Sequence, residues 1–198
     1  MAKLYSQNTL KMGALMPSFS LLRSDSVRKN YIDYYNGKCV LIVFMCNHCP
    51  YVIPKIQTLI DIQNEFVDSL NIVAINSNDA TDYPEDSFEK MTEYAHSWGL
   101  NFDYLYDQTQ KTALDFGAVC TPDLFLFDSD GGLIYHGCID PEHRAVSDGR
   151  TLKEVLNQFL NHAKVATEQL PSLGCSIKWS AEYWEAMEKH FGTSREAK

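Results

Sequence analysis

Two short, unbroken apolar runs mark the first half of the chain. They cover residues 40–45 and 72–75 and are rich in β-branched side chains, which is typical of strands buried on both faces of a sheet. Between them, apolar side chains recur at helical spacing over residues 51–70. A helical crossover of this length predicts a parallel strand–helix–strand unit with a right-handed connection.

The second half of the chain also alternates helices and strands. Helical spacing occurs in three further segments, residues 86–98, 109–116 and 151–162. A short strand is expected at residues 104–106. Two apolar runs, residues 124–127 and 133–136, flank the Gly-rich segment 128–132, which predicts an antiparallel hairpin. This order of elements is that of a thioredoxin-type α/β domain.

Two extensions flank the predicted domain, which we assign to residues 1–164. Residues 19–22 and 33–37 suggest a hairpin that precedes the first buried strand. Residues 165–198 are expected to form a C-terminal extension packed on the domain, with a loop over 167–178 and a helix capped by Ser180. The predicted fold class is therefore α/β: a thioredoxin fold with an N-terminal hairpin extension and a C-terminal loop plus helix.

Charge and composition narrow the classes of partner. The chain of 198 residues has 17 basic and 26 acidic side chains, a net charge of −9, and its basic residues are scattered. Such a surface repels nucleic acid and anionic membranes. The N-terminus has no signal-peptide pattern and no stretch is long enough to span a membrane, so we expect a cytoplasmic protein. Its six cysteines are then more suited to redox chemistry or metal binding than to structural disulfides.

The motif Cys46-Asn47-His48-Cys49-Pro50 stands where the first buried strand ends and a helix begins. A thiol in this position faces free backbone N–H groups and the positive end of the helix, which lowers its pKa. No second Cys-x-x-Cys follows, so a four-cysteine zinc site is disfavoured. His48, if protonated, adds to the effect; alternatively it is a solvent-exposed loop side chain. The placement favours a redox-active pair.

The proline after the second cysteine suggests which thiol attacks. A residue before proline is pushed out of the helical region, whereas proline suits the first helical position. Cys49 is therefore predicted to be the helix N-cap and the attacking thiolate. Cys46, about one turn farther from the free N–H groups, is predicted to resolve the intermediate.

The segment Cys120-Thr121-Pro122 precedes the predicted hairpin. In a thioredoxin-type fold this loop carries a cis-proline beside the dithiol, although an ordinary trans proline is the alternative. Thr121 and Pro122 are thus expected to support the site. Cys120 is predicted to lie beside the pair, as an alternative resolving thiol or a third metal ligand.

The remaining cysteines are assigned structural roles. Cys39 and Cys138 lie near strand ends and are expected to be small buried apolar residues. Cys175 follows Pro171 and Gly174 in the C-terminal extension. It is predicted to be structural or to dock near the body of the domain, with a redox role as the less favoured alternative.

Five blocks together resemble the peroxiredoxin-like branch of the thioredoxin superfamily, that is, the alkyl hydroperoxide reductase and thiol-specific antioxidant family. They are CNHCPYV (46–52), AINSND (74–79), YPED (83–86), GAVCTPD (117–123) and GCSIKW (174–179). The resemblance runs from about residue 17 to 179 and implies a thioredoxin fold, thiol-dependent redox or antioxidant chemistry and no organic cofactor. It also aligns Cys49 with the peroxidatic cysteine. One departure is that Cys46 and Ile42 occupy the positions of the family's Thr/Ser hydroxyl and proline, which weakens the case for a peroxidase.

Two functions remain open from the sequence. The leading hypothesis is a thiol–disulfide oxidoreductase with weak thiol peroxidase activity at most. Its partners are an external dithiol reductant, thioredoxin-like or glutathione, and a protein disulfide or peroxide substrate. The alternative is a metal-binding or metal-delivery protein for zinc or copper, with Cys46, Cys49, Cys120 and His48 as ligands.

Overall fold

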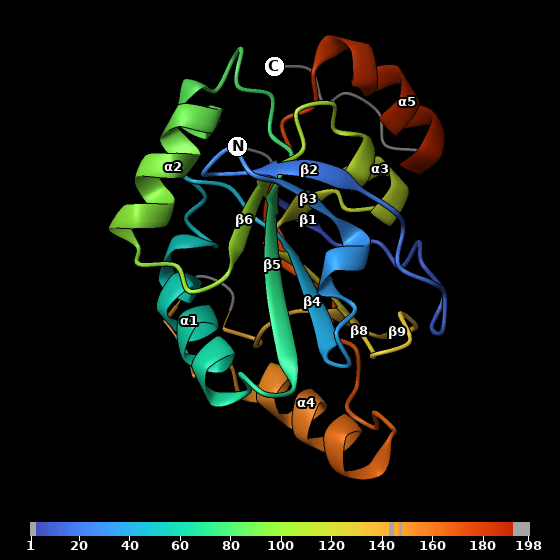
Figure 1. Ribbon diagram of the computed structural model, residues 1–198. Coiled ribbons are helices and arrows are strands. Elements are labelled where there is room, and N and C mark those ends of the chain that lie inside the picture. The colour runs from blue at the N-terminus through green and yellow to red at the C-terminus, as the bar shows by residue number, and fades with distance from the viewer. Residues whose placement is uncertain (1–2, 143–144, 147, 192–198) are drawn as a thin grey trace.

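A seven-stranded mixed sheet forms the centre of the protein (Figure 1). The computed structural model describes residues 3–142, 145–146 and 148–191. The strand order is β3-β2-β6-β5-β4-β8-β9. The bounds are β2 Ser20–Arg23, β3 Arg28–Asn30, β4 Cys39–Phe44, β5 Leu70–Asn76, β6 Asp103–Tyr106, β8 Asp123–Phe127 and β9 Leu133–Gly137. The predicted parallel pairing of the two apolar strands is confirmed as β4 with β5, and the predicted hairpin as β8 with β9.

Helices cover both faces of this sheet. Their bounds are α1 Ile56–Glu65, α2 Phe88–Ser97, α3 Lys111–Phe116, α4 Arg150–His162 and α5 Ala181–Phe191, with 3-10 turns η1 Tyr31–Tyr34, η2 Ile53–Lys55 and η3 Pro84–Asp86. The side chains of β4 alternate between two apolar clusters. Leu41 and Val43 pack with α1, α2 and α4, whereas Ile42 and Phe44 pack with α3 and the N-terminal segment. The continuous apolar run of β4 is therefore explained by burial on both faces.

A second, smaller sheet joins both ends of the chain to the domain. Its strand order is β1-β10-β7, with β1 Lys3–Tyr5, β10 Leu173–Ser176 and β7 Cys120–Thr121. The prediction of a loop throughout 167–178 is wrong at β10. This strand of four residues is too short to show an alternating pattern. It forms because backbone partners are available on both of its edges, in β1 and β7.

The N-terminal hairpin exists, but its second strand differs from the prediction. The strand β3 begins only five residues after β2 ends, and residues 31–34 form η1 rather than a strand. The turn between the strands places Ser26 at a positive φ of 69°. Asp25 stabilises it by accepting a hydrogen bond from the Val27 N–H. Serine at this position is a weak turn signal compared with glycine or asparagine.

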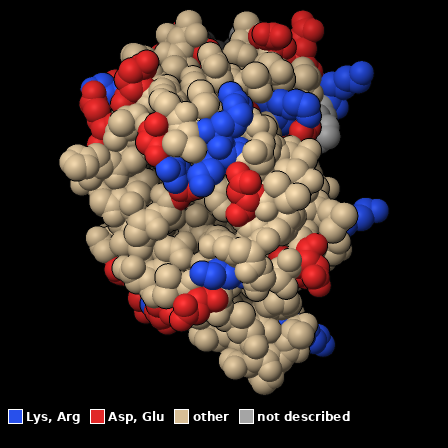
Figure 2. Space-filling model, in the orientation of Figure 1, with Lys and Arg blue, Asp and Glu red and all other residues tan. Residues whose placement is uncertain are grey.

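The surface carries mixed charge. Figure 2 shows basic side chains gathered above the centre of one face, over β2 and β3, with acidic side chains around them. Arg23 pairs with Asp25 and Asp103, and Lys29 pairs with Asp103. Within the described residues, none of the helices has the length and apolar character needed to cross a bilayer.

Candidate active site

The dithiol motif follows the carboxyl end of β4. Both thiols are buried, with Cys46 1% and Cys49 0% exposed. The Cys49 carbonyl accepts hydrogen bonds from the N–H groups of Val52 and Ile53, each at 3.0 Å. Cys49 therefore opens the series of turns that leads into α1. The prediction that Cys49 is the helix N-cap is wrong. The regular helix α1 starts at Ile56 with Lys55 as its N-cap, because η2 with its early proline comes first.

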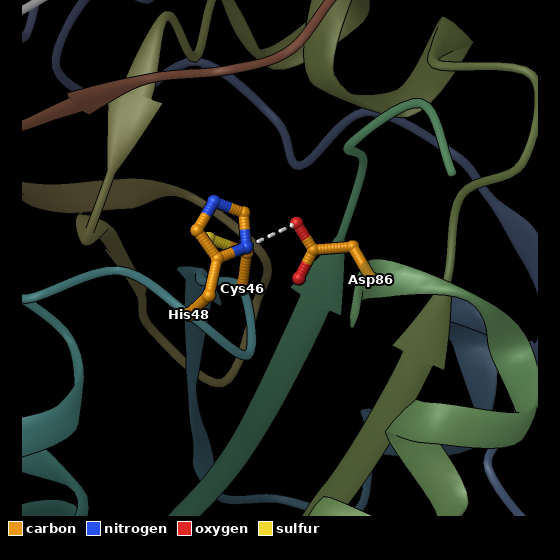
Figure 3. Close-up of side chains that lie close together, drawn as sticks. All are labelled: Cys46, His48 and Asp86. Atoms are coloured by element: carbon orange, nitrogen blue, oxygen red, sulfur yellow. Dashed lines mark ion pairs between the residues drawn. The ribbon is translucent and has the colours of Figure 1, made fainter. Parts of the chain in front are cut away.

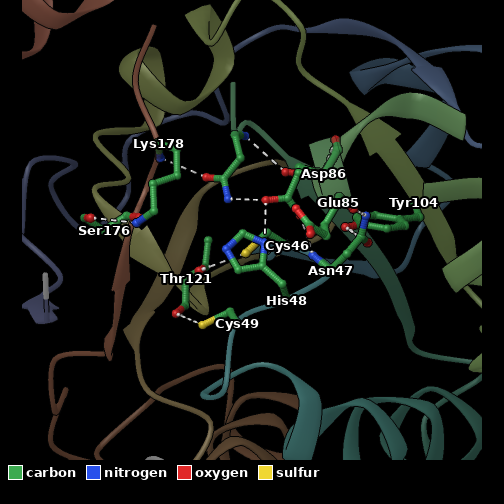
Figure 4. A network of polar contacts seen from close by, with 12 residues as sticks. Cys46, Asn47, His48, Cys49, Glu85, Asp86, Tyr104, Thr121, Ser176 and Lys178 are labelled. Atoms are coloured by element: carbon green, nitrogen blue, oxygen red, sulfur yellow. Dashed lines mark hydrogen bonds and ion pairs between the residues drawn. The ribbon is translucent and has the colours of Figure 1, made fainter. Parts of the chain in front are cut away.

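The loop of Thr121 and Pro122 lies directly against both thiols. The Thr121–Pro122 peptide bond is cis, as the sequence predicts. The Cys49 thiol donates a hydrogen bond to the main-chain oxygen of Thr121 at 3.1 Å. The Cys46 sulfur lies 3.6 Å from the Thr121 hydroxyl oxygen. One residue of this loop thus contacts both members of the pair (Figure 4).

The two thiols differ in their tendency to ionise. Hydrogen bonds from the Cys175 thiol and then from the Cys46 thiol lower the pKa of Cys49, and the Tyr51 N–H contributes in the same direction. The hydrogen bond to Cys49, together with burial, raises the pKa of Cys46. These opposite pKa shifts favour a thiolate at Cys49 over one at Cys46, and their causes are neighbouring thiols rather than the helix N-cap position inferred from Pro50.

A buried carboxylate holds the histidine of the motif. The Nδ1 atom of His48 lies 2.9 Å from Asp86 Oδ2 (Figure 3). This pairing raises the pKa of His48. On its other side the imidazole stacks on Tyr83, with ring centroids 5.9 Å apart and an angle of 3° between the planes. The side chain of His48 is only 20% exposed, so it is a positioned group rather than a free loop side chain.

Asp86 is the centre of a wider polar network (Figure 4). Its carboxylate is 0% exposed and accepts hydrogen bonds from the Asn47 N–H at 2.8 Å and the Asn78 amide at 2.7 Å. The Asn78 side-chain oxygen in turn accepts from the Lys178 N–H at 2.9 Å. The phenol of Tyr104 donates to the Asn47 side-chain oxygen at 2.9 Å. This network connects the dithiol loop with β5, η3 and the segment after β10.

Residues 12–136 match the AhpC/TSA family. The chain belongs to this family. An uncharacterized conserved protein from Geobacillus kaustophilus has 37% sequence identity to this chain and a TM-score of 0.86, over 91% of this chain and 98% of that chain. The thioredoxin-like protein YneN of Bacillus subtilis is 27% identical over 122 residues, which is 62% of this chain and 68% of YneN. The thioredoxin domain of a thiol-disulfide oxidoreductase from Bacteroides vulgatus has 17% identity and a TM-score of 0.60, over 75% of this chain and 100% of that chain.

Membership of the AhpC/TSA family confirms the predicted resemblance, and the structural neighbours confirm the thioredoxin fold. The protein is thus a thiol oxidoreductase of the peroxiredoxin-like part of the thioredoxin superfamily. The hydroxyl group near its thiols comes from Thr121 and approaches Cys46. Within the motif itself, Cys46 occupies the position at which peroxiredoxins are expected to carry Thr or Ser.

The other four cysteines are all free and buried. Cys120 donates a weak hydrogen bond to the Pro122 carbonyl at 3.9 Å. Burial raises the pKa of Cys120, and the charges of Asp123 and Cys49 raise it further. Cys175 and Cys49 shift the pKa of each other, which is lowered at Cys49 and raised at Cys175. Sequence analysis favoured a structural or docking role for Cys175 over a redox role, so it did not predict the interaction of Cys175 with Cys49.

Asp86 was also missed as a site residue. The sequence shows it only as the start of a helical pattern, and nothing in that pattern distinguishes a buried carboxylate from an exposed one. Within the described part of the chain, Cys46, His48 and Asp86 form a group whose possible metal-ligand atoms all lie within 4.8 Å of one another. This group contains Asp86 in place of the Cys49 and Cys120 ligands expected from the sequence.

Proposed function

We propose that the protein is a thiol–disulfide oxidoreductase in which Cys49 attacks the substrate and Cys46 resolves the intermediate. The observation that carries this proposal is the shared contact of both thiols with the cis Thr121–Pro122 loop, at 3.1 Å for Cys49 and 3.6 Å for Cys46. The opposite pKa shifts of the two thiols support the assignment of roles.

The reaction follows from this geometry. The Cys49 thiolate attacks one sulfur of a substrate disulfide, forming a mixed disulfide and releasing a thiolate that takes up a proton. The imidazolium of His48, held by Asp86, is placed to stabilise negative charge at the motif. The Cys46 thiol then loses its proton and attacks the Cys49 sulfur, which releases the second substrate thiol. An external dithiol, such as a thioredoxin-like protein or glutathione, restores the reduced pair.

Burial limits which substrates reach the sulfur atoms. With Cys49 fully buried, a protein disulfide requires local displacement of the covering residues, whereas a small disulfide or a peroxide requires much less. A peroxide converts the Cys49 thiolate to a sulfenic acid, and attack by Cys46 then forms the same disulfide with loss of water. We propose that this peroxidase reaction is weak, because Cys46 replaces the hydroxyl group expected within the motif.

Trapping of the mixed disulfide tests the assignment of roles. With a small aromatic disulfide as substrate, Cys46→Ser is expected to form an adduct on Cys49 far more readily than Cys49→Ser forms one on Cys46. Cys138→Ala is the control, since it removes a buried thiol away from the motif. A stable adduct on Cys46 in Cys49→Ser, with no reaction at Cys49 in Cys46→Ser, would reverse the roles. The reduction potential of the pair then gives its direction, with about −270 mV indicating a reductant and about −120 mV an oxidant.

A second candidate function, metal binding, is favoured by the Cys46, His48 and Asp86 group. Sulfur, imidazole and carboxylate ligands together suit zinc. Titration of the reduced protein with zinc in the presence of a competing chelator tests this function. Stoichiometric binding that is lost in Asp86→Asn and retained in Cys120→Ala would support it. A zinc affinity lower than that of the unfolded chain would exclude a metal-binding function.

A further inference from the structure

Cys175 occupies a position that the oxidoreductase mechanism leaves unused. We infer that Cys175 is a second resolving thiol, which forms an alternative disulfide with Cys49. This inference rests on the proposed function, because it requires Cys49 to be the attacking thiolate. It adds a third thiol to the reaction, supplied by a strand that lies outside the dithiol motif.

The backbone of β10 fixes where this thiol lies. In the small sheet, Cys175 is the register partner of Thr121, and Ser176 is the partner of Cys120. Gly174 packs so closely on the loop that a Cβ atom there would lie 1.9 Å from the main-chain oxygen of Thr121. The same oxygen accepts the hydrogen bond from Cys49. Strand β10 and the Cys49 thiol thus meet at one atom. Because Cys175 lies directly opposite Thr121, its side chain is on the same face of the small sheet as the Thr121 hydroxyl, which approaches Cys46.

Both ends of β10 are tied to other elements. The Ser172 hydroxyl donates to the Gly137 carbonyl at 2.8 Å, and the Ser172 N–H donates to the Ser6 hydroxyl at 2.9 Å. Beyond the strand, the Ile177 N–H donates to the Val119 carbonyl at 2.9 Å. A thiol held by neighbours on both sides has little freedom to leave its place. Cys175 is therefore presented to Cys49 by a fixed strand rather than by a flexible tail.

The Cys175 and Cys49 side chains lie close enough for each to shift the pKa of the other. Both belong to the same buried cluster as Cys46, and Cys175 is only 4% exposed. Cys49 therefore has two thiol neighbours, Cys46 from its own motif and Cys175 from β10. Burial of all three residues limits the access of outside thiols to Cys49, whereas Cys46 and Cys175 are already beside it.

The substrate disulfide is the only oxidant that this reaction needs. After Cys49 has attacked a substrate disulfide, the Cys175 thiol loses its proton and its sulfur attacks the Cys49 sulfur. The bond between Cys49 and the substrate breaks, the Cys49–Cys175 bond forms, and the substrate leaves as a thiol that carries the proton. The substrate disulfide has been reduced by two electrons and the two cysteines have been oxidised. An external dithiol returns them to the reduced state.

The test uses full-length Cys46→Ser and an aromatic disulfide such as 5,5′-dithiobis(2-nitrobenzoate), which releases one coloured thiolate for each exchange step. Attack by Cys49 releases the first equivalent, and resolution by Cys175 releases a second. Peptide mapping is then expected to show a Cys49–Cys175 disulfide. The double variant Cys46→Ser/Cys175→Ala is expected to stop after one equivalent, with the adduct retained on Cys49. The matched control Cys46→Ser/Cys138→Ala removes an equally buried thiol and is expected to release both equivalents.

Three outcomes are distinguishable. A second equivalent with a Cys49–Cys175 disulfide supports the inference. The inference is overturned if the adduct on Cys49 persists in Cys46→Ser. The proposed function is left intact in that case if the unmodified protein releases two equivalents and forms the Cys46–Cys49 disulfide. Reaction that never occurs at Cys49, even in the unmodified protein, overturns both.

If Cys46→Ser does not fold, Cys46→Ala is tested in the same way. Mapping of Cys46→Ala after one equivalent of oxidant provides a further measurement, in which absence of any Cys49–Cys175 linkage counts against the inference.

Discussion

The contact between Gly174 and the cis-proline loop gives a sharp prediction for Gly174→Ala. A Cβ atom at this position would lie 1.9 Å from the Thr121 oxygen and 2.5 Å from the Thr121 carbonyl carbon, whereas real Cβ atoms stay beyond 3.0 Å. The strand must therefore move away by more than 1 Å. The obstacle is backbone, which cannot turn aside as a flexible side chain does. Because β10 pairs with β1 on one edge and β7 on the other, the displacement disturbs two rows of hydrogen bonds.

The magnitude follows from two opposing effects. Overpacking of this kind costs about 1–3 kcal/mol. Replacing glycine by alanine also restricts the unfolded chain, which returns about 0.4–1 kcal/mol. We expect a net loss of about 1–2 kcal/mol in the free energy of unfolding. For a domain of this size, that loss corresponds to a decrease in Tm of about 2–8 °C.

Gly132→Ala is the matched control. The backbone of Gly132, like that of Gly174, has an ordinary φ, and its added Cβ would meet only the end of the Asp128 side chain, at 3.1 Å. We expect its free energy of unfolding to stay within about 0.5 kcal/mol of the unmodified protein. Urea unfolding of the three proteins measures the difference. In the Cys46→Ser background, Gly174→Ala should also reduce the yield of the Cys49–Cys175 disulfide severalfold. A Gly174→Ala protein with unchanged stability and unchanged disulfide yield would refute the reasoning.

Three further predictions concern the thiols, the polar network and a buried ion pair. At pH 6, iodoacetamide is expected to modify Cys49 before Cys46, because hydrogen bonds lower the pKa of the first and raise that of the second; peptide mapping gives the order, and modification of Cys46 first would contradict it. Asp86→Asn is expected to destabilise the protein by about 2–3 kcal/mol. The new amide group would face the Asn47 N–H and the Asn78 amide, which are buried hydrogen-bond donors that now bind the carboxylate. The raised pKa of His48 adds stability that is fully present below the unfolded pKa of about 6.5 and is lost as the pH rises through the folded pKa. The loss of unfolding free energy in Asp86→Asn, measured by urea unfolding, should therefore be larger at pH 6 than at pH 8.5. An equal loss at both pH values would exclude the pairing of His48 with Asp86. Lys55→Ala is expected to cost about 3–5 kcal/mol because it leaves the Asp140 carboxylate buried without its ammonium partner, and a loss below 1 kcal/mol in thermal or urea unfolding would show that the pair is solvated.

The centre of the fold could be predicted because its signals are local. The apolar runs of β4 and β5 are continuous, since both faces are covered, and the helical spacing between them is clear. The dithiol motif then takes its place from the strand that precedes it. The cis-proline loop could be placed beside it only through the fold type, and the contacts of Thr121 agree with that placement.

The rest of the site depends on contacts between distant segments. Asp86 is buried because Asn47, Asn78 and His48 each direct a nitrogen at its carboxylate, and no single one of these residues predicts that arrangement from its own position. Strand β10 is short, contains a glycine and lacks alternation, so its sequence favours a loop. Its strand character comes from β1 and β7, whose pairing partners are not evident from the sequence. The domain boundary at residue 164 and the cytoplasmic location stay predictions.

The small sheet gives the C-terminal segment a part in the site that a separate extension would not have. Strand β10 lies between β1 and β7, so the N-terminal strand supports the same backbone that presents Cys175. The segment after β10 also reaches the far side of the site, where the Lys178 N–H holds Asn78, and Asn78 holds Asp86. One stretch of chain thus supplies a thiol to Cys49 on one side and fixes the carboxylate that positions His48 on the other. Oxidation of Cys175 with Cys49 would join this stretch covalently to the dithiol loop, so the redox state of Cys49 would be coupled to the packing of both chain ends.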